Sequence, residues 1–212
     1  MLKTQLKNIL KLKSKRILLI PLLFSVALPL NTAIADDAAL TKDKCGTCHG
    51  DDGNSKDSKV PSIAGFSAAT IDDIMTQYKS GDREGDKYTP EGGKETDMGT
   101  IAKDLSDEDS KKISAYLATQ KFVAVKQDFD AALAKKGEKK HKKKCEKCHS
   151  DNGANAEDDA AILAGQHRAY LEKEFAKIAA KERDTPKKMK KKFKKLKEDQ
   201  RKALIEFYIS QQ

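Results

Sequence analysis

The sequence is poor in the side chains that usually fill a protein core. Its 212 residues include no tryptophan, and aromatic residues make up 6% of the chain while charged residues make up 35%. Long apolar runs are also scarce: the longest, at 17–30, has fourteen residues, whereas a membrane-spanning helix needs about 20. No segment shows the alternation of a β-strand. These shortages argue against a membrane span and a sheet, and they indicate that something besides side chains is buried.

The N-terminus has the composition of a secretory signal. Residues 3–16 contain six Lys or Arg and no acidic residue, the apolar run follows, and Ala33 and Ala35 complete an A-x-A cleavage site. We therefore predict a signal peptide at 1–35, cleavage near Ala35, and a periplasmic mature chain with no stable membrane insertion. An uncleaved N-terminal anchor is the alternative.

Charge is distributed unevenly along the chain. The formal net charge is +9, but residues 36–120 hold 11 basic and 18 acidic side chains, while residues 121–212 hold 25 and 15. An acidic half of net −7 is therefore followed by a basic half of net +10. The two halves could attract each other or bind different partners, since long-range fields steer association.

The most basic stretch is 187–197, in which eight of eleven residues are lysine. Such a run is typical of nucleic-acid binding, but an exported protein seldom meets nucleic acid, so we expect none as a partner. Met189, Phe193 and Leu196 lie inside the run at helical spacing. We expect these three to face inward while the lysines face water or an acidic protein.

All four cysteines fall in two copies of one motif. CGTCHGDDGN begins at Cys45 and CEKCHSDNGA begins at Cys145. C-x-x-C-H is the attachment motif for c-type haem: two thiols bond to the haem vinyl groups and the next residue, histidine, lies under the iron. The alternatives are two disulfides, which leave both histidines unexplained, a zinc site built from both pairs, and a thioredoxin-like motif, which would need a βαβ pattern. We predict two covalently bound haem c groups, attached through Cys45, Cys48, Cys145 and Cys148 and ligated by His49 and His149.

The repeat continues beyond the haem motifs and identifies the second ligand of each iron. SIAG at 62–65 matches ILAG at 162–165, and at an offset of 91 residues Met98 matches Met189. Haem iron in electron-transfer cytochromes is commonly held by His and Met. We therefore predict that Met98 binds the first iron and Met189 the second. With two protein ligands each iron would have no open position, which favours electron transfer over oxygen or peroxide chemistry.

Three other side chains could bind iron, and we expect other roles for them. Met75 shares a helical face with Ile71, Ile74 and Tyr78 and is expected in the core. His141 lies among lysines and is expected to be exposed. His167 is expected to begin a helix.

Apolar periodicity predicts an all-α fold. The expected helices lie within 67–80, 105–120, 129–144, 167–181 and 197–212. Ser106, three residues before Asp109, resembles a capping box, and Gly137 is a potential break. The first half has about nine extra residues, which we place in a surface loop at 80–97. We predict an N-terminal haem domain at 36–120 and a C-terminal haem domain at 121–212.

These motifs resemble those of the class I cytochromes c, in particular the two-domain dihaem cytochrome c4 type. The resemblance in the first half is carried by CGTCHGDDGNS, VPSIAGF and MGTIAKDLSDEDSKKISAYLA. In the second half, FDAALAKKGEKKHKKKCEKCHSDNGA, EDDAAILAGQHRAYLEKEF and FYISQQ resemble the dihaem subunit of flavocytochrome c sulfide dehydrogenase. The resemblance implies two tandem domains related by a pseudo-twofold axis, and a separate FAD-containing flavoprotein subunit that oxidises sulfide and passes electrons to this chain.

Two further functions compete with that subunit role. One is a free carrier that donates electrons to a terminal oxidase or another reductase. The other is an enzyme in its own right, a thiosulfate dehydrogenase or dihaem peroxidase, which the closed irons and the lack of a spare cysteine disfavour.

One position departs from the common cytochrome pattern. Pro61 matches the proline near the carbonyl that orients the ligand histidine, but the matching residue in the second half is Ala161. Such a bond sets the tautomer and basicity of the ligand, so the partner of His149 is left open. The flavocytochrome subunit is expected to share this lack of proline.

Overall fold

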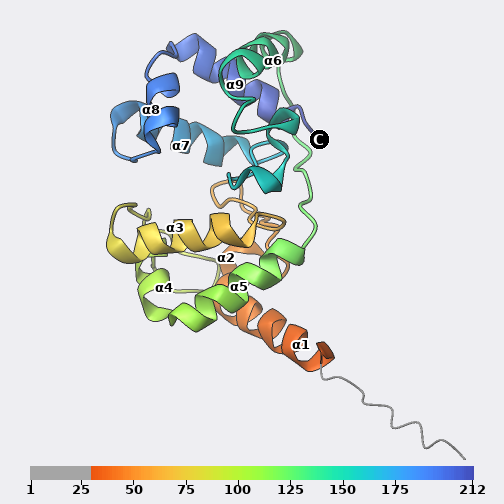
Figure 1. Cartoon of the computed structure of the whole chain (residues 1–212), viewed down its shortest axis with the longest axis vertical. Coiled ribbons are helices and arrows are strands. Elements are labelled where there is room, and N and C mark those ends of the chain that lie inside the picture. The colour runs from red at the N-terminus through yellow and green to blue at the C-terminus, as the bar shows by residue number, and fades with distance from the viewer. Residues whose placement is uncertain (1–29) are drawn as a thin grey trace, which may run out of the picture.

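The computed structural model describes residues 30–212, and its regular elements are helices (Figure 1). The first half contains α1 (Leu30–Thr41), the π-helical turn η1 (Lys42–Gly46), α2 (Thr47–His49), α3 (Ala68–Ser80), α4 (Met98–Asp104) and α5 (Asp107–Thr119). The second half contains α6 (Ala131–Lys144), the 3₁₀ turns η2 (Asp151–Gly153) and η3 (Ala156–Asp158), α7 (Arg168–Ala180), α8 (Lys187–Phe193) and α9 (Glu198–Ile209). Within that range an isolated bridge between Tyr88 and Thr96 is the sole strand-like pairing, which confirms the all-α prediction.

The predicted signal peptide lies outside the described residues, except for 30–35, which begin α1. No helix in the described range is both long and apolar enough to cross a membrane. The five helices expected from periodicity are all present, and α5 begins where Ser106 accepts a hydrogen bond from the backbone N–H of Asp109. The short helices α4 and α8 were not predicted.

Helices α6 and α9 cross at very close range in the second half. A Cβ atom on Gly137 of α6 would lie 1.9 Å from the carbonyl oxygen of Ala203 on α9. Gly137 therefore does not break α6, as its sequence context allowed, but permits the crossing. Ala134, Gly137 and His141 form one buried stripe toward α9.

The expectation that His141 is exposed is wrong. Its side chain is fully buried, its Nδ1 lies 3.0 Å from the Tyr208 hydroxyl oxygen, and its ring centroid lies 5.1 Å from that of Phe207. Lys142 and Lys143 beside it are exposed, but the close crossing turns the stripe containing His141 inward. Burial lowers the pKa of His141, against the opposing effect of the Glu146 carboxylate.

Each half has its own apolar cluster, and the clusters sit in the two lobes of Figure 1. The first includes Phe66, Ile71, Met75, Leu105, Ile113 and Leu117. The second includes Leu171, Phe175, Phe193, Leu204, Phe207 and Tyr208. Ile162 belongs to the first cluster although it comes from the second half. The lobes are therefore packed against each other rather than merely tethered.

The 80–97 loop, whose role the sequence left open, helps to hold the lobes together. Arg83 is buried, and its Nη2 lies 3.2 Å from Oε2 of Glu174 on α7. Asp86 forms ion pairs with Lys173 at 2.7 Å and Lys177 at 2.6 Å. The acidic half and the basic half thus attract each other where α3 and α7 face one another (Figure 1).

Gly137→Ala tests the helix crossing. Alanine favours a helix by about 1 kcal/mol over glycine, but the added methyl group overlaps the α9 backbone, and overpacking costs about 1–3 kcal/mol. We expect net destabilisation in denaturant unfolding. Lys136→Ala, on the exposed side of α6, should stay within about 0.5 kcal/mol of the wild type; equal stability of the two variants would contradict the close crossing.

Candidate haem-binding sites

The first C-x-x-C-H motif closes the run of helix formed by α1, η1 and α2. Cys45 and Cys48 form no disulfide, and burial raises the pKa of the Cys45 thiol to about 11. Cys45 packs against the first apolar cluster, and so does Met98. Residues 53 positions apart in the sequence, one predicted to bind the haem and one its iron, therefore share one core.

His49 is held in a defined tautomer. It is buried, and its Nδ1 lies 2.9 Å from the carbonyl oxygen of Pro61. A carbonyl can only accept, so Nδ1 carries the proton and donates it, which leaves the Nε2 lone pair for a metal. Burial lowers the pKa of His49, so the neutral imidazole that a metal requires is favoured.

The second motif repeats the cysteine and methionine placement. Cys145 and Met189 both pack against the second apolar cluster. Burial raises the pKa of Cys145, as it does that of Cys45. The predicted haem and iron residues of the second half are thus brought to one core as well.

His149 differs from His49. Its Nδ1 is buried and has no hydrogen-bond partner among the residues that the structure describes. The loop that follows His149 also takes a different route. Gly50 adopts a left-handed φ of +81°, whereas the left-handed conformation in the second half moves on to Asp151 (φ 51°) and Asn152 (φ 58°). Ser150 occupies the glycine position, and a side chain disfavours positive φ there.

Asp158 holds the rerouted loop in place. Its carboxylate accepts from the backbone N–H of Ser150 and, at 2.8 and 2.9 Å, from the Ser150 hydroxyl. These bonds lower the pKa of Asp158, the side-chain bond from Ser150 most of all. The partner that the sequence left open for His149 is therefore absent from its own loop.

The two predicted distal ligands begin or lie within short helices. Met98 is the first residue of α4, which is capped by Asp97 accepting from the backbone N–H of Thr100 at 2.9 Å. A hydrogen bond from Lys87, supported by the one from Thr100, lowers the pKa of Asp97 to about 2. The cap is therefore ionised at neutral pH, which suits the positive end of a helix.

Met189 lies within α8 and is half-buried among exposed lysines. Phe193 and Leu196 are buried in the second cluster, as their spacing predicted. The eight lysines of 187–197 are all exposed.

The other iron-binding candidates have different surroundings. Met75 is buried in the first cluster, which agrees with the core role predicted for it. His167 precedes α7, as predicted, but it is buried against the other domain, with Nε2 3.0 Å from the Ser55 carbonyl oxygen.

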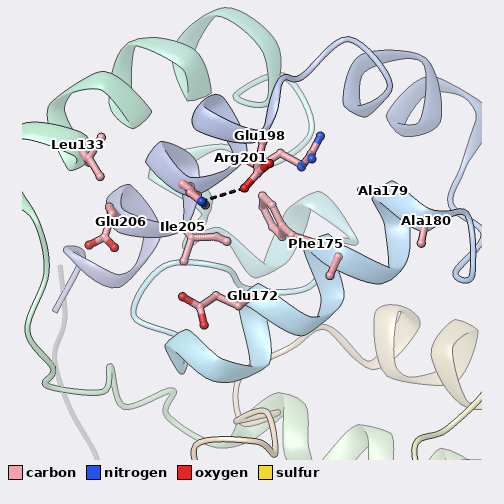
Figure 2. Close-up of a pocket in the computed structure, with 11 residues that line it drawn as sticks. Leu133, Glu172, Phe175, Ala179, Ala180, Glu198, Arg201, Ile205 and Glu206 are labelled. Carbon is pink, nitrogen blue, oxygen red and sulfur yellow. Dashed lines mark ion pairs between the residues drawn. The ribbon is translucent and has the colours of Figure 1, made fainter.

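A pocket of about 640 Å³ lies between α6, α7 and α9 (Figure 2). Phe175, Ala176 and Ile205 are among its apolar lining residues, and the exposed Glu198 and Lys202 pair at 2.8 Å beside them. None of the predicted haem or iron residues lines it, so this pocket is not the haem site.

Buried charge at the domain interface fits a bound anionic group. Arg83 and Arg183, at matching repeat positions, both pair with the single carboxylate of Glu174. Nε of Arg183 is buried without a partner in the described part of the chain. Two guanidinium groups thus face one carboxylate. Sequence reasoning missed both arginines, although their 100-residue offset signals them. Haem carries two propionates, whose negative charge suits this excess.

Comparison with known proteins agrees with the helical fold and the two motifs. Residues 35–121 match the family model described as cytochrome c, and residues 132–207 match the one described as cytochrome C oxidase, cbb3-type, subunit III. Cytochrome c4 of Stutzerimonas stutzeri is 34% identical over 172 residues, covering 74% of this chain and 79% of the relative. The chain belongs to the cytochrome c4 family.

Solved structures extend the likeness to three dimensions. The reduced recombinant cytochrome c4 of Pseudomonas stutzeri superposes with a TM-score of 0.66 at 28% identity, covering 84% of this chain and 98% of that one. A thiosulfate dehydrogenase (TsdBA) of Marichromatium purpuratum gives a TM-score of 0.67 at 20% identity and is covered over 40% of its length, which shows a shared fold alone. This c4-type chain therefore has two tandem cytochrome c domains, each with one covalent haem c, and is a dihaem electron carrier.

Ser150→Gly tests the difference between the two histidines. Glycine allows a left-handed turn at 150, which would bring the carbonyl of residue 161 to His149. A stronger bond at Nδ1 makes the imidazole a better donor, so we expect a lower reduction potential for the second haem in spectroelectrochemical titration.

Gly50→Ser is the matched control in the first motif. A Cβ there would meet the Asn54 carbonyl oxygen at 2.4 Å, and strain of this kind costs about 1–3 kcal/mol. It should raise the potential of the first haem. Unchanged reduction potentials in both variants would show that the loop conformation after each ligand histidine does not affect the donor strength of that histidine.

Proposed function

We propose that this chain is an exported, periplasmic dihaem carrier with His–Met ligation of both irons. Cys45 and Cys48 would attach the first haem, with His49 and Met98 on its iron. Cys145 and Cys148 would attach the second, with His149 and Met189 on its iron. The observation that carries the proposal is the placement of Cys45 with Met98 on one apolar cluster and of Cys145 with Met189 on the other.

Each bound haem supplies reversible one-electron transfer, and this chain's residues set the conditions for it. The apolar clusters exclude water. The Pro61 carbonyl orients His49. A neutral methionine sulfur favours ferrous iron and so raises the potential relative to a second histidine.

Two settings for this carrier have support. Similarity to cytochrome c4 over 79% of the relative's length favours a free carrier that feeds a terminal oxidase or another reductase. The second-half segments and Ala161 favour a subunit that accepts electrons from a sulfide-oxidising flavoprotein. Purification from the native periplasm decides between them: a stoichiometric flavin that stays with the haem supports the subunit role, and its absence supports the free carrier.

Methionine replacement tests the ligand assignment. We expect Met98→Leu and Met189→Leu each to remove about half of the charge-transfer absorption band that reports sulfur–iron bonding, and the double variant to remove all of it. The measurement is the visible spectrum of the oxidised holoprotein.

Met75→Leu is the control for the methionine series. It changes the same residue type inside the first cluster, and a volume-conserving swap there costs less than about 1.5 kcal/mol. The band should be retained in full. Loss of the band in this variant, or its retention in the double variant, would refute the assignment.

The exposed lysines of α8 are proposed to dock an acidic redox partner beside the second haem. Replacing Lys187, Lys188, Lys190 and Lys191 by glutamine should slow reduction of hexacyanoferrate(III), a small anionic oxidant. Steering of this kind raises association rates by about 10-fold or more, and the dependence on ionic strength should flatten.

An equal change of charge on α6 provides the comparison. Lys135, Lys136, Lys139 and Lys142 are also exposed, but they lie on a helix that carries no predicted iron ligand. Their replacement by glutamine should slow the reaction far less. The same loss in both variants would mean that net charge, not a docking surface, controls the rate.

A further inference from the structure

Gln166 of the second domain binds the backbone of the first domain. Its side chain is fully buried. Its Oε1 accepts from the backbone N–H of Ser62 at 2.9 Å, and its Nε2 donates to the carbonyl of the same residue at 2.8 Å. One amide group thus satisfies both backbone groups of Ser62, the residue directly after Pro61.

His167 makes a second contact to the same loop. Its Nε2 donates to the Ser55 carbonyl oxygen at 3.0 Å, so this side chain is also held in one tautomer. The backbone N–H of Tyr170 donates to the Ser58 carbonyl at 3.1 Å. The start of α7 therefore holds residues 55–62 of the first domain near both ends.

The held loop connects directly to the first haem motif. The Ser55 backbone N–H donates to the Ser62 hydroxyl at 3.1 Å, and the Ser55 hydroxyl donates to the Cys48 carbonyl at 3.2 Å. The Pro61 carbonyl accepts from His49 Nδ1. The side chains of Ser55 and Ser62 are buried, so little in this network can shift independently.

The arrangement has no counterpart in the opposite direction. Position 66, which matches Gln166 in the repeat, is phenylalanine, and position 67, which matches His167, is serine. Ser67 reaches the second domain through an exposed hydrogen bond to Asp159 at 3.0 Å. Within the described chain, the first domain therefore braces no carbonyl for His149.

We propose that Gln166 and His167 are positioning residues for the haem of the other domain. They hold the 55–62 loop so that the Pro61 carbonyl stays on His49 Nδ1, and docking of the second domain thereby sets the donor strength of the first iron's proximal ligand. This inference rests on the proposed ligation by His49. A weaker bond at Nδ1 makes the imidazole a poorer donor and raises the potential of that haem.

Gln166→Met in the full holoprotein tests the inference, because methionine keeps the length of the side chain and removes both hydrogen bonds. The potential of the first haem should rise while that of the second stays unchanged, with the haems assigned by the proton resonances of their methionine methyl groups. Exchange of the His49 Nδ1 proton with deuterium should become faster. Gln166→Glu, which can still accept from the Ser62 backbone N–H, should show a smaller rise in the potential of the first haem. If the methionine variant does not fold, the potentials and the proton exchange are measured on this variant instead.

Asp86→Asn is the control for loss of docking in general. It removes the ion pairs to Lys173 and Lys177 at another part of the interface without touching the 55–62 loop. It should leave both potentials unchanged. Equal shifts of both haems in Gln166→Met, no shift of either, or the same shift in Asp86→Asn would overturn the inference. Wild-type protein without two iron-shifted methionine methyl resonances would instead refute the proposed ligands.

Discussion

The hydrogen bond from a ligand histidine to a backbone carbonyl links the haem site of the first domain to the packing of the two domains. A histidine that binds a metal through Nε2 carries its proton on Nδ1, and a carbonyl that accepts a hydrogen bond from Nδ1 fixes the ring orientation and makes the imidazole a stronger donor. A backbone carbonyl can orient the histidine in this way only if the loop that contains it has a fixed conformation. In the first domain the Pro61 carbonyl accepts from His49. The next residue, Ser62, is held by two hydrogen bonds between its backbone and the side chain of Gln166 in the second domain. Domain packing and ligand chemistry are therefore linked at a single peptide.

The two halves repeat one unit, and small sequence differences make their sites unequal. Ser150 stands where the first half has Gly50, and the loop that follows it takes a different route. Of the matched residues Phe66 and Gln166, only Gln166 bonds to the backbone of the other domain. Each half contributes charges of both signs to the ion pairs across the boundary. Arg83 and Asp86 of the acidic half meet Glu174, Lys173 and Lys177 of the basic half. Because the Gln166 and His167 contacts have no counterpart from the first domain, the interface is asymmetric although the fold is nearly symmetric.

Much of the fold could be predicted because it depends on local pattern. The apolar periodicity predicts helices α3, α5, α7 and α9 to within a few residues of their observed bounds, and Ser106 predicts where α5 begins. The haem motifs and the methionines were visible because the repeat places them in register. Helix α4 was missed because seven residues give too few turns for a periodicity. In α8 the helical spacing of Met189, Phe193 and Leu196 was visible, but a segment this short was not assigned as a helix.

What the sequence could not provide are contacts between distant segments. His141 looks exposed in a lysine run, and only the crossing at Gly137 turns it inward. Gln166 and His167 look like the polar start of a helix, and nothing local says that their partners are Ser62 and Ser55 in the other domain. Yet each outlier is a polar or very small side chain that becomes buried, a state that is stable only when a specific partner or a close backbone requires it. In a repeat, the positions that break the match with such residues are therefore the places to look for contacts between the copies.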